Sequence, residues 1–230
     1  MGGRIDCYID IASLYSYLGF VHLVNNLNTL ESHGVKIEFH PILLGAVMAN
    51  SGNKPPWSLK AKARYGAIEW PRATAQAGRP DIRFPDNLMP MAHTVLPLRA
   101  LHYIKANHPR ETFHAALEYL FHKFWTPPNL NLSQADVFAG VLAGFEGFSP
   151  DECEKILAGA KSQEMKDALT RSTQSALDKG AFGAPWLWVR NDKGEAEPFF
   201  GSDRFQYVYK FLGLPYQDVE LLPPGGRAKL

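Results

Sequence analysis

"RIDCYIDIASLYSYLGF", residues 4–20, decides the fold, because it joins a strand to a helix through two serines. Apolar residues alternate along residues 4–11, a pattern that is typical of a β-strand. Apolar residues then recur at helical spacing along residues 14–28. Ser13 and Ser16 therefore lie where the strand ends and the helix begins, and we expect free backbone N–H groups of that helix beside Ser13.

A second strand follows this helix. Gly34 ends the helical unit, and residues 35–44 (VKIEFHPILL) are rich in β-branched and aromatic side chains. A strand, a helix and a second strand in this order predict a parallel pair joined by a right-handed crossover.

The middle of the chain is predicted to be helical. Segments with a helical period lie near residues 59–77, 92–107, 110–125, 133–145 and 149–178. Breakers such as Pro127-Pro128 separate them. No strand-like alternation of any length interrupts this block, so we expect it to contain helices alone.

Strand character returns at residues 186–190 (WLWVR), and a turn at residues 191–194 leads to a short strand at 197–200. A last helix is expected over residues 205–212. The order βαβ, helical block, αββα predicts an α/β protein with a thioredoxin-like core that an all-helical insertion domain interrupts. The expected boundaries are 1–57 and 179–230 for the core and 58–178 for the insertion domain.

Composition disfavours several classes of partner. The 230 residues include 24 basic and 23 acidic ones, a net charge of +1, so we expect no nucleic acid partner. The apolar runs fall far short of the roughly 20 residues that a membrane span needs, and charges near the start argue against a signal peptide. Cys7 and Cys153 form no CxxC or zinc spacing, so we predict no metal site.

The junction at Ser13 is the first candidate for chemistry. In thioredoxin-like redox proteins a CxxC motif occupies this position, and the helix N-terminus stabilises its thiolate. Here the four residues are Ser13-Leu14-Tyr15-Ser16, so disulfide exchange is impossible at this position. The Ser13 hydroxyl can still stabilise a thiolate that a ligand brings. The alternative is that Ser13 is only a helix N-cap.

A proline turn before the last two strands is the second candidate. In GAFGAPW, residues 180–186, Pro185 stands directly before a strand, although proline cannot donate a hydrogen bond inside a sheet. A cis Ala184–Pro185 bond would leave the backbone of Ala184 free to pair with an extended peptide ligand. The alternative is a plain proline at the entry to a strand.

Two polar loops complete the set of candidates. In the GSDR loop, Ser202 could hold a ligand carboxylate and Asp203 an ammonium group, or both could be ordinary caps of the last helix. In the SGNKPP loop, Asn53, with the nearby Lys62, could reach an anionic peptide end, or the loop could be a hinge with solvated charges. A thioredoxin-type topology would bring Ser13, the proline turn and the GSDR loop to one edge of the sheet.

These stretches together resemble the kappa-class glutathione transferases, which share the fold of DsbA-like oxidoreductases with the 2-hydroxychromene-2-carboxylate isomerases. The resemblance is carried by SLYSYLGF, PILLGAVMANSGNKPP, KARY, RFP, GAFGAPW, FGSDR and the terminal RAKL. GAFGAP together with FGSDR favours the kappa class over the isomerases. One residue departs from the family pattern, because Leu14 stands where the family usually has proline.

The resemblance implies a site for glutathione as co-substrate. It implies that Ser13 is the catalytic hydroxyl that lowers the pKa of the glutathione thiol, with Leu14 and Tyr15 beside it. The further residues that it places against glutathione are Asn53, Lys62, Ala184, Pro185, Ser202 and Asp203.

The same resemblance implies a homodimer that conjugates glutathione to small electrophiles or reduces organic peroxides. Ala228-Lys229-Leu230 is similar to the Ser-Lys-Leu peroxisomal address, so we expect a peroxisomal or mitochondrial protein, with the cytoplasm as the alternative. A glutathione-dependent isomerase and a non-catalytic thioredoxin-fold binding protein are the alternative functions.

Overall fold

The computed structural model describes residues 2–217, so the expected address at residues 228–230 lies outside the described residues. In chain order the elements are β1 (Gly3–Ile9), α1 (Leu14–Asn25), α2 (Leu27–Ser32), β2 (Val35–Pro41), α3 (Leu44–Ser51), the 3-10 helix η1 (Pro56–Ser58), α4 (Lys60–Gln76), α5 (Leu88–Met91), α6 (Val95–Asn107), α7 (Arg110–Trp125), α8 (Ala135–Ala143), α9 (Pro150–Lys161), α10 (Gln163–Asp178), β3 (Trp186–Asn191), β4 (Ala196–Phe200) and α11 (Phe205–Phe211).

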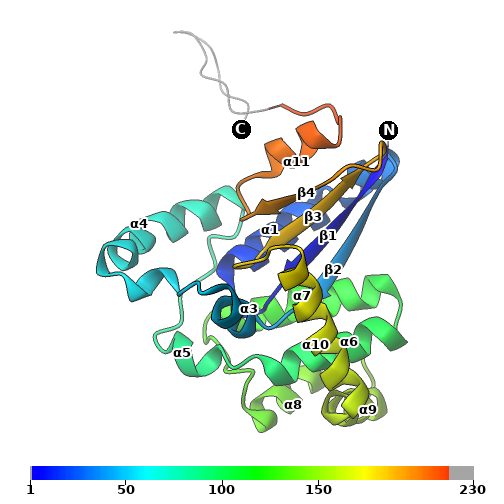
Figure 1. The fold of residues 1–230 in the computed structure, drawn as a ribbon. Coiled ribbons are helices and arrows are strands. Elements are labelled where there is room, and N and C mark those ends of the chain that lie inside the picture. The colour runs from blue at the N-terminus through cyan, green and yellow to red at the C-terminus, as the bar shows by residue number, and fades with distance from the viewer. Residues whose placement is uncertain (1, 218–230) are drawn as a thin grey trace.

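A four-stranded sheet in the order β2-β1-β3-β4 lies at the centre of the fold (Figure 1). β1 runs parallel to β2, with Ile5 opposite Ile37, whereas β3 is antiparallel to both β1 and β4. The predicted parallel pair, the predicted hairpin and the α/β thioredoxin-like fold are therefore confirmed.

Both faces of the sheet are buried near the carboxyl end of β1. Cys7 and Ile9 belong to the main hydrophobic core, together with side chains of α1 and α7. Tyr8 points to the other face, where it packs in a second cluster with Val47 of α3 and Ala176 of α10. Because both faces are covered, the carboxyl end of β1 is held firmly at the point where the chain reaches Ser13.

β2 forms one edge of the sheet, and side chains of α6 cover part of it. Lys105 Nζ donates a hydrogen bond to the Phe39 carbonyl at 2.6 Å, and His102 Nε2 bonds to the Pro41 carbonyl at 2.9 Å. These bonds use backbone acceptors that would otherwise be open for pairing with another strand.

The second strand is shorter than predicted, and a helix is found where the sequence indicated strand and loop. β2 ends at Pro41, and α3 begins at Leu44. The Leu43 N–H donates to Thr173 Oγ1 at 3.0 Å, and the Leu44 N–H donates to Asp10 Oδ2 at 2.7 Å. Side-chain oxygens far away in the sequence thus accept hydrogen bonds from the backbone N–H groups at the start of α3.

The helical block is confirmed for the described residues, with finer boundaries. The segment 149–178 consists of two helices, because Ser162 ends α9 and caps α10 by accepting the Met165 N–H at 3.2 Å. α6, α9 and α10 pack on one another, whereas α4 projects away from the sheet and buries only Thr74 (Figure 1). Within residues 2–217, no helix is long and apolar enough to cross a membrane.

Candidate active site

Ser13 lies at the start of α1, and its hydroxyl makes two hydrogen bonds. Its Oγ accepts the Ser16 N–H at 3.1 Å, so Ser13 is the N-cap of α1. The same hydroxyl donates to the Ala184 carbonyl at 3.0 Å. Ser13 is only 7% exposed. The N-cap of α1 is thus bonded directly to the proline turn that the sequence singled out.

The proline turn has the predicted cis Ala184–Pro185 bond. The Gly201 N–H donates to the Pro185 carbonyl at 3.1 Å, which joins the turn to the loop before α11. A Cβ atom built on Gly19 of α1 would lie 3.2 Å from Pro185 Cγ and 3.8 Å from Ser202 Cβ. α1, the turn and Ser202 therefore approach one another closely, as predicted.

Asn53 of the SGNKPP loop and Lys62 of α4 differ in whether they contact the proline turn. Asn53 Nδ2 donates to the Phe182 carbonyl at 2.7 Å, so Asn53 is bound to the proline turn. Lys62 is exposed on α4 and makes no hydrogen bond or salt bridge with any residue that the structure describes. The structure thus brings Asn53, but not Lys62, into contact with the site.

Tyr15 connects α1 with α4 and with the GSDR loop. Burial raises the pKa of Tyr15 to about 12, and the carboxylates of Glu69 and Asp203 act in the same direction. Ser202 and Asp203 are not helix caps, because the N-cap of α11 is Arg204 and no side chain caps that helix. The capping interpretation of this loop is therefore wrong, and Asp203 instead forms an ion pair with Arg204.

The remaining two residues of the SLYS tetrad face the interior. The Leu14 side chain is 4% exposed and packs in the main core, so only its backbone is placed to meet a ligand. Ser16 is fully buried and its Oγ accepts the Asp10 N–H at 3.4 Å. Ser16 therefore holds the strand–helix junction together, whereas Ser13 bonds to the proline turn.

Asp10 is a residue of the site that the sequence reasoning missed. It is 1% exposed, and its carboxylate accepts hydrogen bonds from the Ala12 N–H at 3.0 Å, Thr94 Oγ1 at 2.7 Å and the Leu44 N–H at 2.7 Å. Its backbone carbonyl also accepts the Ser13 N–H at 3.0 Å. Burial raises the pKa of Asp10 to about 6. The sequence signal was an acid directly after the strand and three residues before Ser13.

The arrangement favours an anion beside Ser13. The first N–H groups of α1, a helix of 12 residues, and the helix dipole both stabilise negative charge at this end. The two cysteines of the chain, Cys7 and Cys153, are free and buried, and burial raises the pKa of each thiol. Neither is part of this site, so a reacting thiolate here has to come from a bound molecule.

The fold and this site define a protein of the DsbA-like thioredoxin class. Residues 4–213 match the DSBA-like thioredoxin domain family. A solved structure of a 2-hydroxychromene-2-carboxylate isomerase has the same fold, with a TM-score of 0.68, 21% identity, and coverage of 91% of this chain and 94% of that chain.

The curated relatives narrow this class further. The chain is 31% identical over 215 residues to glutathione S-transferase kappa 1 of Caenorhabditis elegans, covering 92% of each chain. It is 28% identical over 231 residues to the human protein of the same name, covering 98% of this chain and 97% of that one. The chain belongs to the kappa-class glutathione S-transferases and is an enzyme of that class.

Proposed function

We propose that the enzyme binds glutathione along the edge formed by Ser13, Ala184 and Ser202 and conjugates it, through its sulfur, to a small electrophile. The observation that carries the proposal is the hydrogen bond of 3.0 Å between the Ser13 hydroxyl and the Ala184 carbonyl. This bond places a hydroxyl donor at a helix N-terminus directly beside a backbone position that can pair with an extended tripeptide.

The hydroxyl proton changes its partner when glutathione binds. In the free enzyme it is donated to the Ala184 carbonyl. We assign that carbonyl to the N–H of the cysteinyl unit, so that the Ser13 hydroxyl turns to the sulfur. Ser13 Oγ keeps accepting the Ser16 N–H, which polarises its O–H bond toward the sulfur.

The gain for the reaction is a larger fraction of thiolate. A free thiol has a pKa of about 8.5, so only a few per cent is ionised at neutral pH, and each unit of lowering corresponds to about 1.4 kcal/mol. The sulfur lone pair then forms the bond to the electrophilic carbon, and the leaving group departs with the electrons of the bond that breaks. Reduction of organic peroxides by the same thiolate is a further proposed activity.

The ends of the tripeptide are assigned to the polar loops. Ser202 and Asp203 receive the γ-glutamyl end, because Ser202 packs beside α1 and Pro185 and the carboxylate of Asp203 suits an ammonium group. Asn53 and Lys62 receive the other end. Asn53 already bonds to the turn, and Lys62 supplies a positive charge from α4.

The test is Ser13→Ala, with Ser16→Ala as the matched control from the same tetrad. Losing a hydrogen bond to a charged acceptor, about 1.5–3 kcal/mol, should raise the pKa of the bound thiol by about 1–2 units. Ultraviolet titration of the thiolate measures that pKa, calorimetry measures glutathione binding, and conjugation of a chlorodinitrobenzene measures turnover. We expect Ser13→Ala to lose most turnover with little change in binding. Full activity in this variant would refute the role of Ser13.

A glutathione-dependent isomerase is the second candidate function, favoured by the similarity in fold to the 2-hydroxychromene-2-carboxylate isomerase. In that case glutathione adds to the substrate and leaves again. Counting thiols over many turnovers separates the two functions, because a transferase consumes one thiol for each product and an isomerase consumes none.

We also propose that the enzyme is a homodimer and that its last three residues direct it to peroxisomes, with mitochondria and cytoplasm as alternatives. Light scattering on a sizing column tests the dimer. Deleting residues 228–230 from a fluorescent fusion tests the address.

A further inference from the structure

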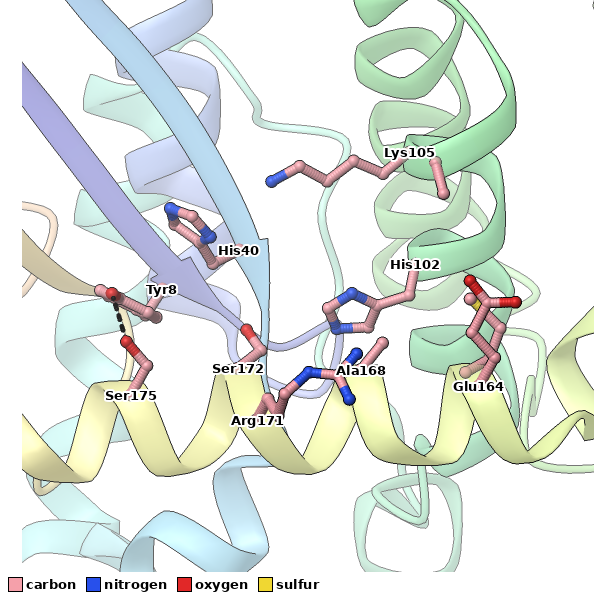
Figure 2. A pocket seen from close by; sticks show the side chains of 11 residues that line it. Tyr8, His40, His102, Lys105, Glu164, Ala168, Arg171, Ser172 and Ser175 are labelled. Atoms are coloured by element: carbon pink, nitrogen blue, oxygen red, sulfur yellow. Dashed lines mark hydrogen bonds between the residues drawn. The ribbon is translucent and has the colours of Figure 1, made fainter.

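A cavity of about 530 Å³ lies at the β2 edge of the sheet, between β2, α6 and α10. Figure 2 shows side chains of β1, β2, α6 and α10 around it. Its lining residues are Tyr8, His40, His102, Lys105, Ala106, Glu164, Met165, Ala168, Arg171, Ser172 and Ser175. None of them is among the residues assigned to glutathione, so this is a second site. Its volume falls within the range of small-molecule sites.

Two cations reach the cavity from opposite helices. Lys105 of α6 has three N–H donors, and two of its polar contacts are the Phe39 carbonyl and the carboxylate of Glu38. Arg171 of α10 makes no hydrogen bond or salt bridge with any residue that the structure describes. Its five donors are therefore open to a ligand. The one carboxylate in the lining, Glu164, lies at the end away from Tyr8 (Figure 2).

Two neutral imidazoles line the same space and act as acceptors. His102 Nε2 must carry a proton, because it bonds to the Pro41 carbonyl, and burial lowers the pKa of His102 to about 4, with Lys105 and Arg171 acting in the same direction. His40 Nε2 bonds to Asp6 Oδ1 at 2.7 Å, and burial lowers the pKa of His40. The Nδ1 atom of each ring is therefore an unprotonated acceptor at neutral pH.

A buried hydroxyl without a partner borders the same cavity. Ser172 Oγ is shielded from solvent and forms no hydrogen bond within the described part of the chain. Figure 2 shows this hydroxyl pointing away from α10, toward the cavity. A buried polar group that stays unsatisfied costs about 1–3 kcal/mol, and rotation of the Ser172 side chain into the cavity would let an acceptor there satisfy it.

We propose that this cavity binds a short dicarboxylate that carries a hydroxyl group, of the chemical type of malate. One carboxylate pairs with Arg171, and the other accepts the remaining donor of Lys105. The hydroxyl of the ligand donates to the Nδ1 atom of His102, which only a ligand with a donor can use. The cavity thus combines cationic donors and neutral acceptors in the proportion that a hydroxydicarboxylate presents.

Calorimetry of the full chain with sodium malate at constant ionic strength tests the proposal. We expect binding at millimolar concentrations or better, and a Kd for Arg171→Gln that is about tenfold higher or more, because a charge-assisted hydrogen bond is lost. Lys166→Gln is the matched control, since it removes an exposed cation of α10 that does not line the cavity. We expect its Kd to equal that of the wild type. No binding of malate, or the same Kd in both variants, would overturn the proposal.

Two further measurements define the ligand and separate this site from the active site. Succinate, which lacks the hydroxyl, should bind severalfold more weakly than malate, and equal affinity would overturn the role of the imidazoles. Malate should bind with the same affinity to Ser13→Ala and in the presence of saturating glutathione. Competition between malate and glutathione would show that malate occupies the active site instead, and would overturn the second site while leaving the proposed transferase intact.

Discussion

Replacing Asp10 with asparagine should change how the stability of the protein depends on pH. The carboxyl of Asp10 is 1% exposed, and its pKa is raised by burial to about 6, compared with about 3.9 in an unfolded chain. Because the folded state holds this proton more tightly, the stabilising effect is present below pH 4. It is lost as the pH rises through 6. Asparagine has nearly the same shape and does not titrate.

The magnitude follows from the two pKa values. Between pH 4.5 and 7.5, protonation linkage removes about 2 kcal/mol from the unfolding free energy of the wild type at this position and nothing from Asp10→Asn. The variant also loses an acceptor for the Leu44 N–H, which costs about 1–3 kcal/mol at every pH and does not alter the slope. The difference in stability, wild type minus variant, should therefore decrease by about 2 kcal/mol over this range.

Urea denaturation of both proteins at several pH values measures this difference, and the other carboxylates cancel because both proteins contain them. The three hydrogen bonds that Asp10 accepts favour the carboxylate and oppose the effect of burial. If the stability advantage of the wild type increased with pH, the hydrogen bonds would outweigh burial. The argument from burial would then be wrong.

Two other predictions concern Ser16 and the cysteines. Ser16→Ala should lower the unfolding free energy by about 1 kcal/mol in urea denaturation, because the Asp10 N–H loses its side-chain acceptor. The pKa of the thiol of bound glutathione should stay unchanged in this variant. A raised thiol pKa would contradict the division of roles between Ser13 and Ser16. Cys7 and Cys153 are buried with raised pKa values, so a disulfide reagent at neutral pH should react slowly with both in the native protein and rapidly in urea. Rapid reaction of the native protein would show that these thiols are accessible.

The parts of the fold that the sequence predicted correctly are those with local signals. Alternation along β1, the glycine-containing turn between β3 and β4 and the proline at position 185 each act within a few residues. The same is true of Ser13, because an N-cap is recognised by its place between a strand and a helix. The chain boundaries of the core and insertion domain, at residues 57–58 and 178–179, stay a prediction.

The resemblance identified candidate residues without placing them. Asn53 is bonded to the proline turn, but Lys62 has no such contact within the described residues. Ser202 and Asp203 precede α11 without capping it, which their residue types alone would not show. A motif shows which side chain is present at a position. The residues that this side chain contacts depend on how separate loops pack together.

The features that the sequence could not show depend on contacts between distant segments. α3 was missed because its start is held by Thr173 of α10 and by Asp10 after β1, 130 and 34 residues away. The residues that line the cavity are equally dispersed in the sequence, since the hydroxyls of Tyr8 and Ser175 meet at 3.1 Å across 167 residues.

α3 connects this cavity with the candidate active site. Thr173 directly follows Ser172 of the cavity, and the backbone carbonyl of Asp10 accepts the Ser13 N–H. The first turn of α3 is therefore bonded on one side to the helix that lines the cavity and on the other to the strand end that leads to Ser13. An Asp10→Asn variant weakens the second of these bonds while leaving the cavity's own residues unchanged, so its malate affinity should equal that of the wild type.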